Sequence, residues 1–565
     1  MVTPNVLMVY PRFNPHSFWS HEPLCDLLGA RCTEPPLGLM TVAALLPPAW
    51  KIRLVNRNAE DLTESDLAWA DLVMTGGMLF QQNDTLAIID RAHAHGKPVV
   101  IGGPDVTSSP ESYRSADFLV LGEAEGIIDQ FVAAWSAGAK QGDFEGVRFQ
   151  VDVTQSPVPR FDLLNLSHYL AMTVQYSRGC PFSCEFCDII ELYGRLPRAK
   201  ASEQILGELD ALYSAGWRGP VDFVDDNFIG NKKALKKFLP LLGEWQKARG
   251  YPFRFQTEAS INLSDDAELL RLMGAANFQA VFIGIESPDP ETLVSAQKYQ
   301  NTRRNLTESV HRVYDAGIYV VAGFILGFDT EKDGVAEAMI EAIEAMSIPV
   351  SMVGLLFALQ DTQLSRRLRT EGRMLPVEAN KGDQCTGGLN FITLRPRRAI
   401  LEDYRTVLKR LYAPEAFFGR VRMMGRALKG AEYAGGRTLV EVRRELRAIG
   451  RLAWCMTFTR PQLRRHFWKT VLDCVVHNHS SLVPVLTMIA YYLHLGTFAQ
   501  FVIKDLDRQI ETLDLEASQA PLPEAASLSG QGQSFDYPPQ HPTMGRPRNP
   551  PPLVTRALMP GDPVG

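Results

Sequence analysis

Three cysteines stand within eight residues of one another, in the stretch SRGCPFSCEFC that begins at Ser177. Their spacing, C-x3-C-x2-C, places the thiols of Cys180, Cys184 and Cys187 on one tight loop, where they can ligate three irons of a [4Fe–4S] cluster. Since no fourth cysteine is near, the fourth iron would be open to another ligand. Zinc usually takes four ligands, and no histidine or fourth cysteine follows at finger spacing. Zinc and a chance group of buried thiols are the alternatives.

With Phe186 just before the last cysteine, this loop resembles that of the radical S-adenosylmethionine (SAM) enzymes. The resemblance implies that the open iron chelates SAM and that the reduced cluster cleaves it to methionine and a 5′-deoxyadenosyl radical. The stretch FVDDNF matches the polar motif that binds the SAM amino group in this superfamily. We therefore expect Asp225 and Asp226 to face that ammonium. Helix N-capping by Asp226 or Asn227 is the structural alternative.

Three further strand ends fit a SAM pocket by the same resemblance, namely QTEAS, GIES and GFILGFD. In the superfamily such regions contact the ribose, the methionine and the adenine. The candidate residues are Glu258, Ser260, Gly284, Glu286, Ser287 and Ile325. Glu258 and Glu286 could instead be structural ion-pair partners.

The elements that must position these residues alternate between strands and helices. Residues 171–375 contain six successive strand–helix units, which predict a partial (β/α)6 TIM barrel with its chemistry at the carboxyl ends of the strands. Residues 1–140 alternate short apolar runs with amphipathic stretches, which predicts a doubly wound, flavodoxin-like parallel sheet. Small residues follow three of its strands, where such sheets bind ligands. They are Thr75, Gly76, Gly77, Gly102, Gly103, Pro104 and Gly122, followed by Glu123.

A doubly wound domain ahead of such a barrel resembles the cobalamin-binding class of radical SAM enzymes. In that class the small-residue loops admit the corrin edge and the nucleotide tail, because glycine lets the backbone approach closely. Many such domains carry D-x-H-x-x-G, whose histidine binds cobalt. His16 has the matching offset, but the aspartate and glycine are absent, so cobalt without a protein histidine is favoured. A vestigial or nucleotide-binding module is the alternative, although G-x-G-x-x-G is missing.

The remaining segments predict a linker at 141–170, a helical domain at 376–515 and a disordered tail at 516–565. The helical part resembles the extra domain of hopanoid-methylase-like members. Within it, the nearly uncharged stretch 482–503 is long enough to span a membrane. We expect a buried helix there, with peripheral membrane contact or a true span as alternatives. Nearby basic residues fit membrane contact or a solvated face, namely Arg460, Arg464, Arg465 and Lys469.

The composition of the chain argues against several classes of protein. The 565 residues are 45% hydrophobic and 22% charged, with a formal net charge of −6, which argues against general nucleic-acid binding. Eight cysteines are too few for a disulfide scaffold in a chain of this length. The N-terminal residues lack the pattern of a secretory signal, so we expect a cytoplasmic protein, with membrane association as an option.

The resemblance implies a cobalamin-dependent radical SAM enzyme that methylates an unactivated carbon of a lipid or other small molecule. It also implies two SAM molecules, one as methyl donor and one as radical source, and a flavodoxin- or ferredoxin-type reductant. Cyclisation, ring rearrangement or oxidation without net methyl transfer is the first alternative. A tRNA-modifying methylthiotransferase fits less well, because only Cys25 and Cys32 lie in the N-terminal domain. A non-catalytic corrinoid-binding partner protein is the third alternative.

Overall fold

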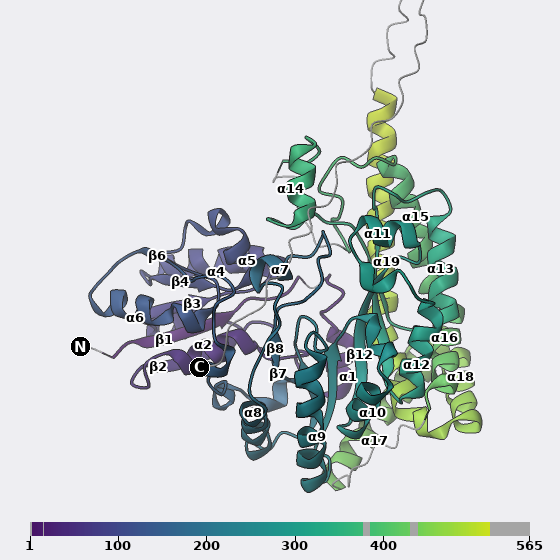
Figure 1. Cartoon of the computed structure of the whole chain (residues 1–565), viewed down its shortest axis with the longest axis horizontal. Coiled ribbons are helices and arrows are strands. Elements are labelled where there is room, and N and C mark those ends of the chain that lie inside the picture. The colour runs from purple at the N-terminus through teal and green to yellow at the C-terminus, as the bar shows by residue number, and fades with distance from the viewer. Residues whose placement is uncertain (1–2, 15, 377–384, 430–438, 520–565) are drawn as a thin grey trace, which may run out of the picture. The chain divides into compact units, whose positions relative to one another are not determined.

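The computed structural model describes residues 3–14, 16–376, 385–429 and 439–519 (Figure 1). Most of the predicted disordered tail lies outside these residues. The first four tail residues, 516–519, belong to the last helix, so the helical region ends slightly later than predicted.

The N-terminal sheet contains six parallel strands in the order β2-β1-β3-β4-β5-β6. Alternate residues of the strands enter different cores, as Val6 and Met8 do on one face and Leu7 and Val9 on the other. Burial of both faces explains why the strands read as continuous apolar runs. The strands are β1 (Asn5–Tyr10), β2 (Lys51–Asn56), β3 (Leu72–Thr75), β4 (Val99–Gly102), β5 (Phe118–Leu121) and β6 (Gly142–Glu145).

Helices connect these strands, which confirms the doubly wound prediction. They are α1 (Glu22–Leu28), α2 (Leu37–Leu45), α3 (Glu64–Trp69), α4 (Gln82–Ala94), α5 (Pro104–Ser108) and α6 (Ile128–Ser136). The edge strand β6 falls in the stretch that we predict as a linker, so this sheet extends beyond residue 140.

The second sheet also has six parallel strands, in the order β14-β13-β12-β11-β10-β7, and confirms the partial barrel. Its strands are β7 (Met172–Val174), β10 (Gly219–Phe223), β11 (Phe253–Glu258), β12 (Phe278–Glu286), β13 (Tyr319–Leu326) and β14 (Ser351–Leu355). The helices between them are α8 (Ser202–Ser214), α9 (Lys232–Ala248), α10 (Ala267–Ala275), α11 (Pro290–Ser295), α12 (Leu306–Asp315) and α13 (Val335–Met346). Two short strands, β8 (Ser177–Arg178) and β9 (Arg198–Ala199), form an antiparallel pair. The three cysteines and α7 (Ile189–Leu192) lie in the segment that connects these two strands.

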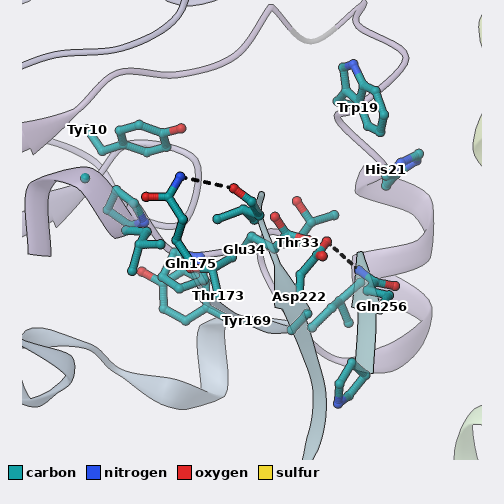
Figure 2. A pocket seen from close by; sticks show the side chains of 18 of the residues that line it. Tyr10, Trp19, His21, Thr33, Glu34, Tyr169, Thr173, Gln175, Asp222 and Gln256 are labelled. Carbon is teal, nitrogen blue, oxygen red and sulfur yellow. Dashed lines mark hydrogen bonds between the residues drawn. The ribbon is translucent and has the colours of Figure 1, made fainter. Parts of the chain in front are cut away.

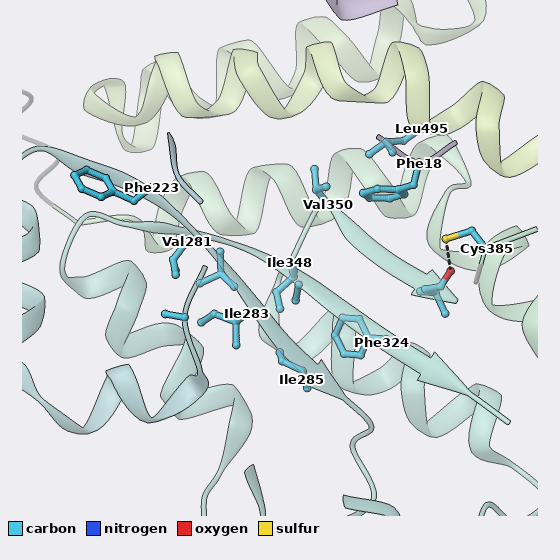
Figure 3. Packing of buried hydrophobic residues seen from close by; sticks show 14 of the residues in the cluster. Phe18, Phe223, Val281, Ile283, Ile285, Phe324, Ile348, Val350, Cys385 and Leu495 are labelled. Atoms are coloured by element: carbon cyan, nitrogen blue, oxygen red, sulfur yellow. Dashed lines mark hydrogen bonds between the residues drawn. The ribbon is translucent and has the colours of Figure 1, made fainter. Parts of the chain in front are cut away.

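The C-terminal region is helical, as predicted. Its elements are α14 (Gln363–Thr370), α15 (Arg397–Leu411), α16 (Pro414–Ala427), α17 (Leu439–Trp454), a π turn (Cys455–Thr459), α18 (Arg464–His477) and α19 (Leu482–Gln519). Leu495 of α19 joins the same buried cluster as Phe18 and the barrel residues Ile283, Phe324 and Val350 (Figure 3).

Among the described residues, α19 is the one helix that is long and apolar enough to span a membrane. However, 67% of its most apolar window is buried inside the protein. The imidazole Nε2 of His494 also lies 3.1 Å from the carbonyl oxygens of both Ser17 and Phe18. These contacts agree with the buried core helix that the sequence leads us to expect.

Candidate active site

The carboxylates of Asp225 and Asp226 contact the backbone at the start of the cysteine loop. Asp225 accepts the N–H groups of Tyr176 (2.8 Å) and Ser177 (2.7 Å), and Asp226 accepts that of Gly179 (2.7 Å). Burial raises the pKa of Asp225 to about 7 and that of Asp226 to about 6, against the effect of these hydrogen bonds. These contacts position the loop, and the contact with the SAM ammonium that the resemblance implies stays a prediction.

Amide donors surround the thiols of this loop. The side-chain nitrogen of Asn227 lies 3.7 Å from Sγ of Cys180, and that of Gln300 lies 3.6 Å from Sγ of Cys184. Such donors favour thiolate over thiol and suit sulfurs that ligate iron. Among the described residues, no three His, Cys, Asp or Glu side chains converge on a point where they could hold a single metal ion. A cluster does not need such convergence, because each of three irons takes one thiolate, and the donor set therefore fits it.

Glu286 forms a buried ion pair with Lys298, with 2.7 Å between Oε1 and Nζ. Burial alone would lower the pKa of Lys298, but Glu286 and Cys184 raise it above its ordinary value. The ammonium also lies 5.9 Å from the centre of the Phe186 ring. This ion pair is the alternative that we considered for Glu286, and its contact with SAM stays a prediction. No motif drew attention to Lys298, which lies in a loop outside the strand–helix pattern.

The other strand-end candidates lie at the same edge of the barrel sheet. Ser260 Oγ donates to Asn262 (2.7 Å), and the carbonyl of Gly284 accepts from Asn301 (3.1 Å). Ser287 is fully buried and Ile325 is partly buried on β13. Carboxyl ends of parallel strands meet at one edge, so this gathering follows from the fold.

A cavity of about 1400 Å³ lies between the N-terminal sheet and the barrel. It exceeds the roughly 300–1,000 Å³ of drug-sized ligand pockets. The eight N-terminal candidates all line it, namely Thr75, Gly76, Gly77, Gly102, Gly103, Pro104, Gly122 and Glu123. Gly103 and Gly122 have φ angles of 105° and 100°, which side chains would strain. These residues fit a large planar cofactor that must approach the backbone.

An acidic pair lies inside the cavity, formed by Glu34 before α2 and Asp222 on β10 (Figure 2). Asp222 accepts from Nε2 of Gln256 at 2.8 Å. Burial raises the pKa of Glu34 well above its ordinary value, and the adjacent Asp222 raises it further. Burial likewise raises the pKa of Glu258, another cavity residue, to about 8. Glu34 and Asp222 therefore favour a state in which one carboxyl is protonated, because both cannot ionise together at low cost.

Sequence reasoning missed this pair. Asp222 alternates with the buried Val221 and Phe223, and that period-two pattern could have indicated a polar side chain facing the cavity. Glu34 lies in a connecting segment and carries no comparable signal.

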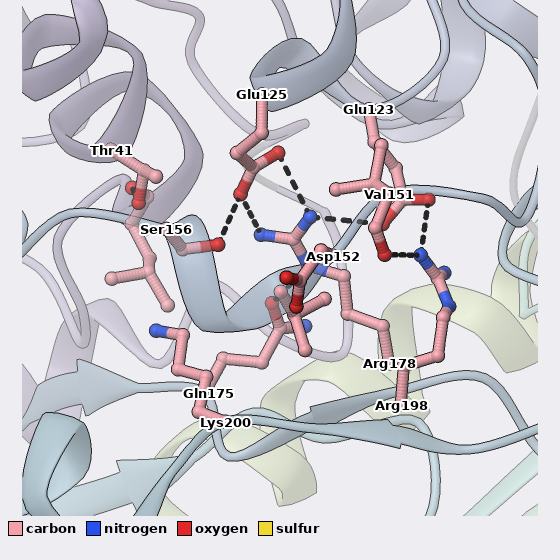
Figure 4. Close-up of polar contacts among 12 residues, drawn as sticks. Thr41, Glu123, Glu125, Val151, Asp152, Ser156, Gln175, Arg178, Arg198 and Lys200 are labelled. Atoms are coloured by element: carbon pink, nitrogen blue, oxygen red, sulfur yellow. Dashed lines mark hydrogen bonds and ion pairs between the residues drawn. The ribbon is translucent and has the colours of Figure 1, made fainter.

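Ion pairs join the N-terminal loops to the cysteine hairpin (Figure 4). Arg178 contacts Glu123 at 2.9 Å and Glu125 at 2.7 Å, and Arg198 contacts Glu123 at 2.8 Å. Burial alone would raise the pKa of Glu125, but Arg178 outweighs it and holds that pKa at about 2. Glu123 therefore borders the cavity as part of a charged network.

His16, the candidate cobalt ligand, stacks on Phe501 of α19 with 4.1 Å between ring centroids. It is not among the described residues that line the cavity. This placement does not support His16 as a cobalt ligand.

Comparison with known proteins gives the family. Residues 174–343 match the Radical SAM superfamily, and residues 362–508 match a domain of unknown function. An uncharacterized methyltransferase of Synechocystis sp. is 41% identical over 506 residues, which cover 89% of this chain and 94% of that protein. The hopanoid C-2 methylase of Rhodopseudomonas palustris is 39% identical over 420 residues, covering 74% and 78%. The chain belongs to the family of radical SAM methylases that contains these two relatives.

Solved structures of radical SAM enzymes share the fold. The cobalamin-dependent enzyme OxsB, with aqua-cobalamin bound, superposes with a TM-score of 0.56 at 16% identity, covering 91% of this chain and 81% of that one. The methyltransferase TsrM of Kitasatospora setae gives 0.54 at 17% identity, covering 72% and 85%. The Radical SAM match gives SAM and a [4Fe–4S] cluster as cofactors, and the relatives are methyltransferases. The shared fold agrees with the cobalamin domain that the sequence predicts. The chain is therefore an enzyme rather than a non-catalytic corrinoid-binding partner.

Proposed function

We propose that this methylase transfers a methyl group to an unactivated carbon of an apolar lipid held in the cavity. The observation that carries the proposal is the cavity of about 1400 Å³, which the N-terminal loops, the barrel and α19 line together. The hopanoid C-2 methylase supports a lipid, because it is 39% identical.

The cavity wall away from the glycine loops suits an apolar substrate. Trp19 packs on Phe282 of the barrel with 5.9 Å between ring centroids, and Tyr491 of α19 packs near His21. Burial, together with the nearby His494, lowers the pKa of His21 to about 3, so its imidazole is neutral. Such a wall excludes water from a radical reaction and offers a lipid mostly ring and aliphatic surface.

The residues of this chain have distinct tasks under the proposal. When bound, the cluster and cobalamin supply reductive SAM cleavage and methyl transfer. Cys180, Cys184 and Cys187 would hold the cluster, while Asp225 and Asp226 position their loop. The proposal also includes the SAM contacts that the resemblance implies. They are assigned to Phe186, Asp225, Asp226, Glu258, Ser260, Gly284, Glu286, Ser287 and Ile325.

The acidic pair would orient the substrate. Glu34 and Asp222 present carboxyl oxygens to the cavity. The buried hydroxyl of Thr173 also lines it and has no hydrogen-bond partner among the described residues. We assign these three groups to a hydroxyl on the otherwise apolar substrate, because a few convergent polar groups fix orientation in such pockets.

The proposal also includes the class of reductant and the place of the enzyme in the cell. A low-potential flavodoxin or ferredoxin is the class of protein that can reduce such a cluster. We place the enzyme in the cytoplasm, in peripheral contact with the membrane that contains its lipid.

The test is anaerobic purification with cobalamin supplied, followed by assays of iron, sulfide and corrin. Dithionite, SAM and a hopanoid-containing lipid extract are then added. We expect 5′-deoxyadenosine, S-adenosylhomocysteine and a lipid product about 14 Da heavier. The Cys184→Ala variant should form none of them. Deoxyadenosine with an unmethylated, oxidised or cyclised lipid would contradict methylation, and a methylated polar metabolite would contradict the lipid.

A further inference from the structure

An exposed apolar surface runs along α17, the π turn and α18, toward the lower right of Figure 1. We call it the apolar patch. Its members are Leu446, Ile449, Trp454, Phe458, Trp468, Leu472, Val475 and Val476, which are between 38% and 76% exposed. On α18 they follow the spacing i, i+4, i+7, i+8, so they form one stripe of the helix.

Contacts between these elements make the patch continuous. The rings of Trp454 and Phe458 lie 4.5 Å apart, and Nε1 of Trp468 donates to the hydroxyl of Thr457 at 3.1 Å. Soluble proteins rarely expose so many large apolar side chains together unless the surface binds something.

Basic residues surround this patch. Residues 439–477, which span α17, the π turn and α18, contain eight Lys and Arg but only three acidic residues, in a chain whose net charge is −6. Two of these acids are in ion pairs, Glu445 with Arg254 and Asp473 with Arg426. The exposed cations are Arg443, Arg447, Arg451, Arg464, Arg465 and Lys469. The surface is therefore apolar at its centre and positive around it.

The patch also reaches the cavity. Ile449 belongs to the patch and lines the cavity, together with Ala448 and Leu452 of the same helix. Leu28 of α1 lines the cavity too and is 40% exposed. The guanidinium of Arg451 donates to the carbonyl of Leu27 at 3.3 Å, which holds α17 against α1 at this opening.

We propose that the apolar patch docks on the surface of an anionic phospholipid bilayer, and that the lipid substrate enters the cavity between Leu28 and Ile449. Tryptophan, aliphatic side chains and a border of Lys and Arg are the combination that binds the interface of anionic membranes. The entry step rests on the proposed function, whereas docking does not. The surface is distinct from the stretch 482–503, which the sequence suggested for membrane contact and which is mostly buried.

Flotation with vesicles tests docking on the full-length protein without turnover. Phosphatidylcholine vesicles are compared with and without phosphatidylglycerol. The apolar variant carries Phe458→Ser, Leu472→Ser and Val476→Ser, and the charge variant carries Arg464→Gln, Arg465→Gln and Lys469→Gln. The matched control carries Val147→Ser, Leu196→Ser and Leu394→Ser, at residues that are just as exposed but lie outside the patch.

We expect the wild type and the control to float with anionic vesicles. Both patch variants should bind these vesicles at least about tenfold more weakly than the wild type. Circular dichroism and the thermal midpoint verify that each variant folds. Wild-type protein that stays unbound, or patch variants that bind as tightly as wild type, would overturn docking. Docking would also be overturned if the wild type is a dimer that does not bind vesicles and the apolar variant is a monomer. The patch would then join two copies of the chain. Vesicle binding without lipid methylation would keep docking and reject the proposed substrate.

Discussion

At the scale of single residues, the carboxylate of Asp225 acts on the cysteine loop through two backbone N–H groups. Hydrogen bonds to a charged group contribute roughly 1.5–3 kcal/mol each. We expect Asp225→Asn to loosen the loop and to lower the iron and sulfide bound per chain by at least half. The Asp289→Asn variant, which alters an N-cap on α11, is the control. Full iron content in Asp225→Asn would show that the loop does not need this carboxylate.

The buried Glu258 predicts a pH dependence. Its pKa is about 8 in the folded protein, against roughly 4.3 in an unfolded chain. The folded state therefore holds this proton more tightly than the unfolded chain does. The contribution of Glu258 to the free energy of unfolding is complete below pH 4 and is lost as the pH rises through 8. The thermal midpoint of the cofactor-free protein should fall between pH 6 and pH 9. In Glu258→Gln the fall should be smaller, and identical pH profiles would contradict the assignment.

At the scale of elements, Arg178 links the cysteine hairpin to the loop after β5. Replacing it with methionine leaves Glu123 and Glu125 buried without this cation, which we expect to cost about 3–5 kcal/mol in urea unfolding. Arg398 pairs with Asp514 at 2.9 Å, but both side chains are about half exposed. Arg398→Met should therefore cost less than about 1 kcal/mol. Equal losses in the two variants would show that burial does not set the strength of these pairs.

Element prediction succeeded where burial leaves a strong pattern and failed where it does not. Strands buried on both faces, such as β1 and β4, are continuous apolar runs. The edge strand β6 reads GDFE and is half exposed, so it resembles a loop in sequence. The Glu34–Asp222 pair could not be predicted from spacing, because its members come from different domains and meet only in the folded chain. The cysteine loop could be predicted because its three thiols are neighbours in sequence.

At the scale of the whole molecule, the candidate corrin surface and the candidate cluster loop lie on different domains, so we expect that they can be impaired separately. Gly103 has a φ of 105° and lines the cavity, so Gly103→Ala should strain the backbone by about 1–3 kcal/mol and reduce the corrin bound. Its iron and sulfide content should stay at the wild-type level. Gly96→Ala is the control outside the cavity lining; its φ of 64° lies in the ordinary left-handed region, so alanine strains the backbone less there. Corrin loss in both variants would mean that general destabilisation causes it.

The order of the elements along the chain has a consequence for biosynthesis. Both sheets precede residue 356, whereas Leu486, Ala490 and Tyr491 of α19 supply the last wall of the cavity. Domains fold largely in the order of their synthesis. We therefore expect a nascent chain paused before α19 to have its glycine loops folded and its chamber still uncovered. A bulky cofactor could be loaded at this stage, and translation of α19 would then close the chamber over it.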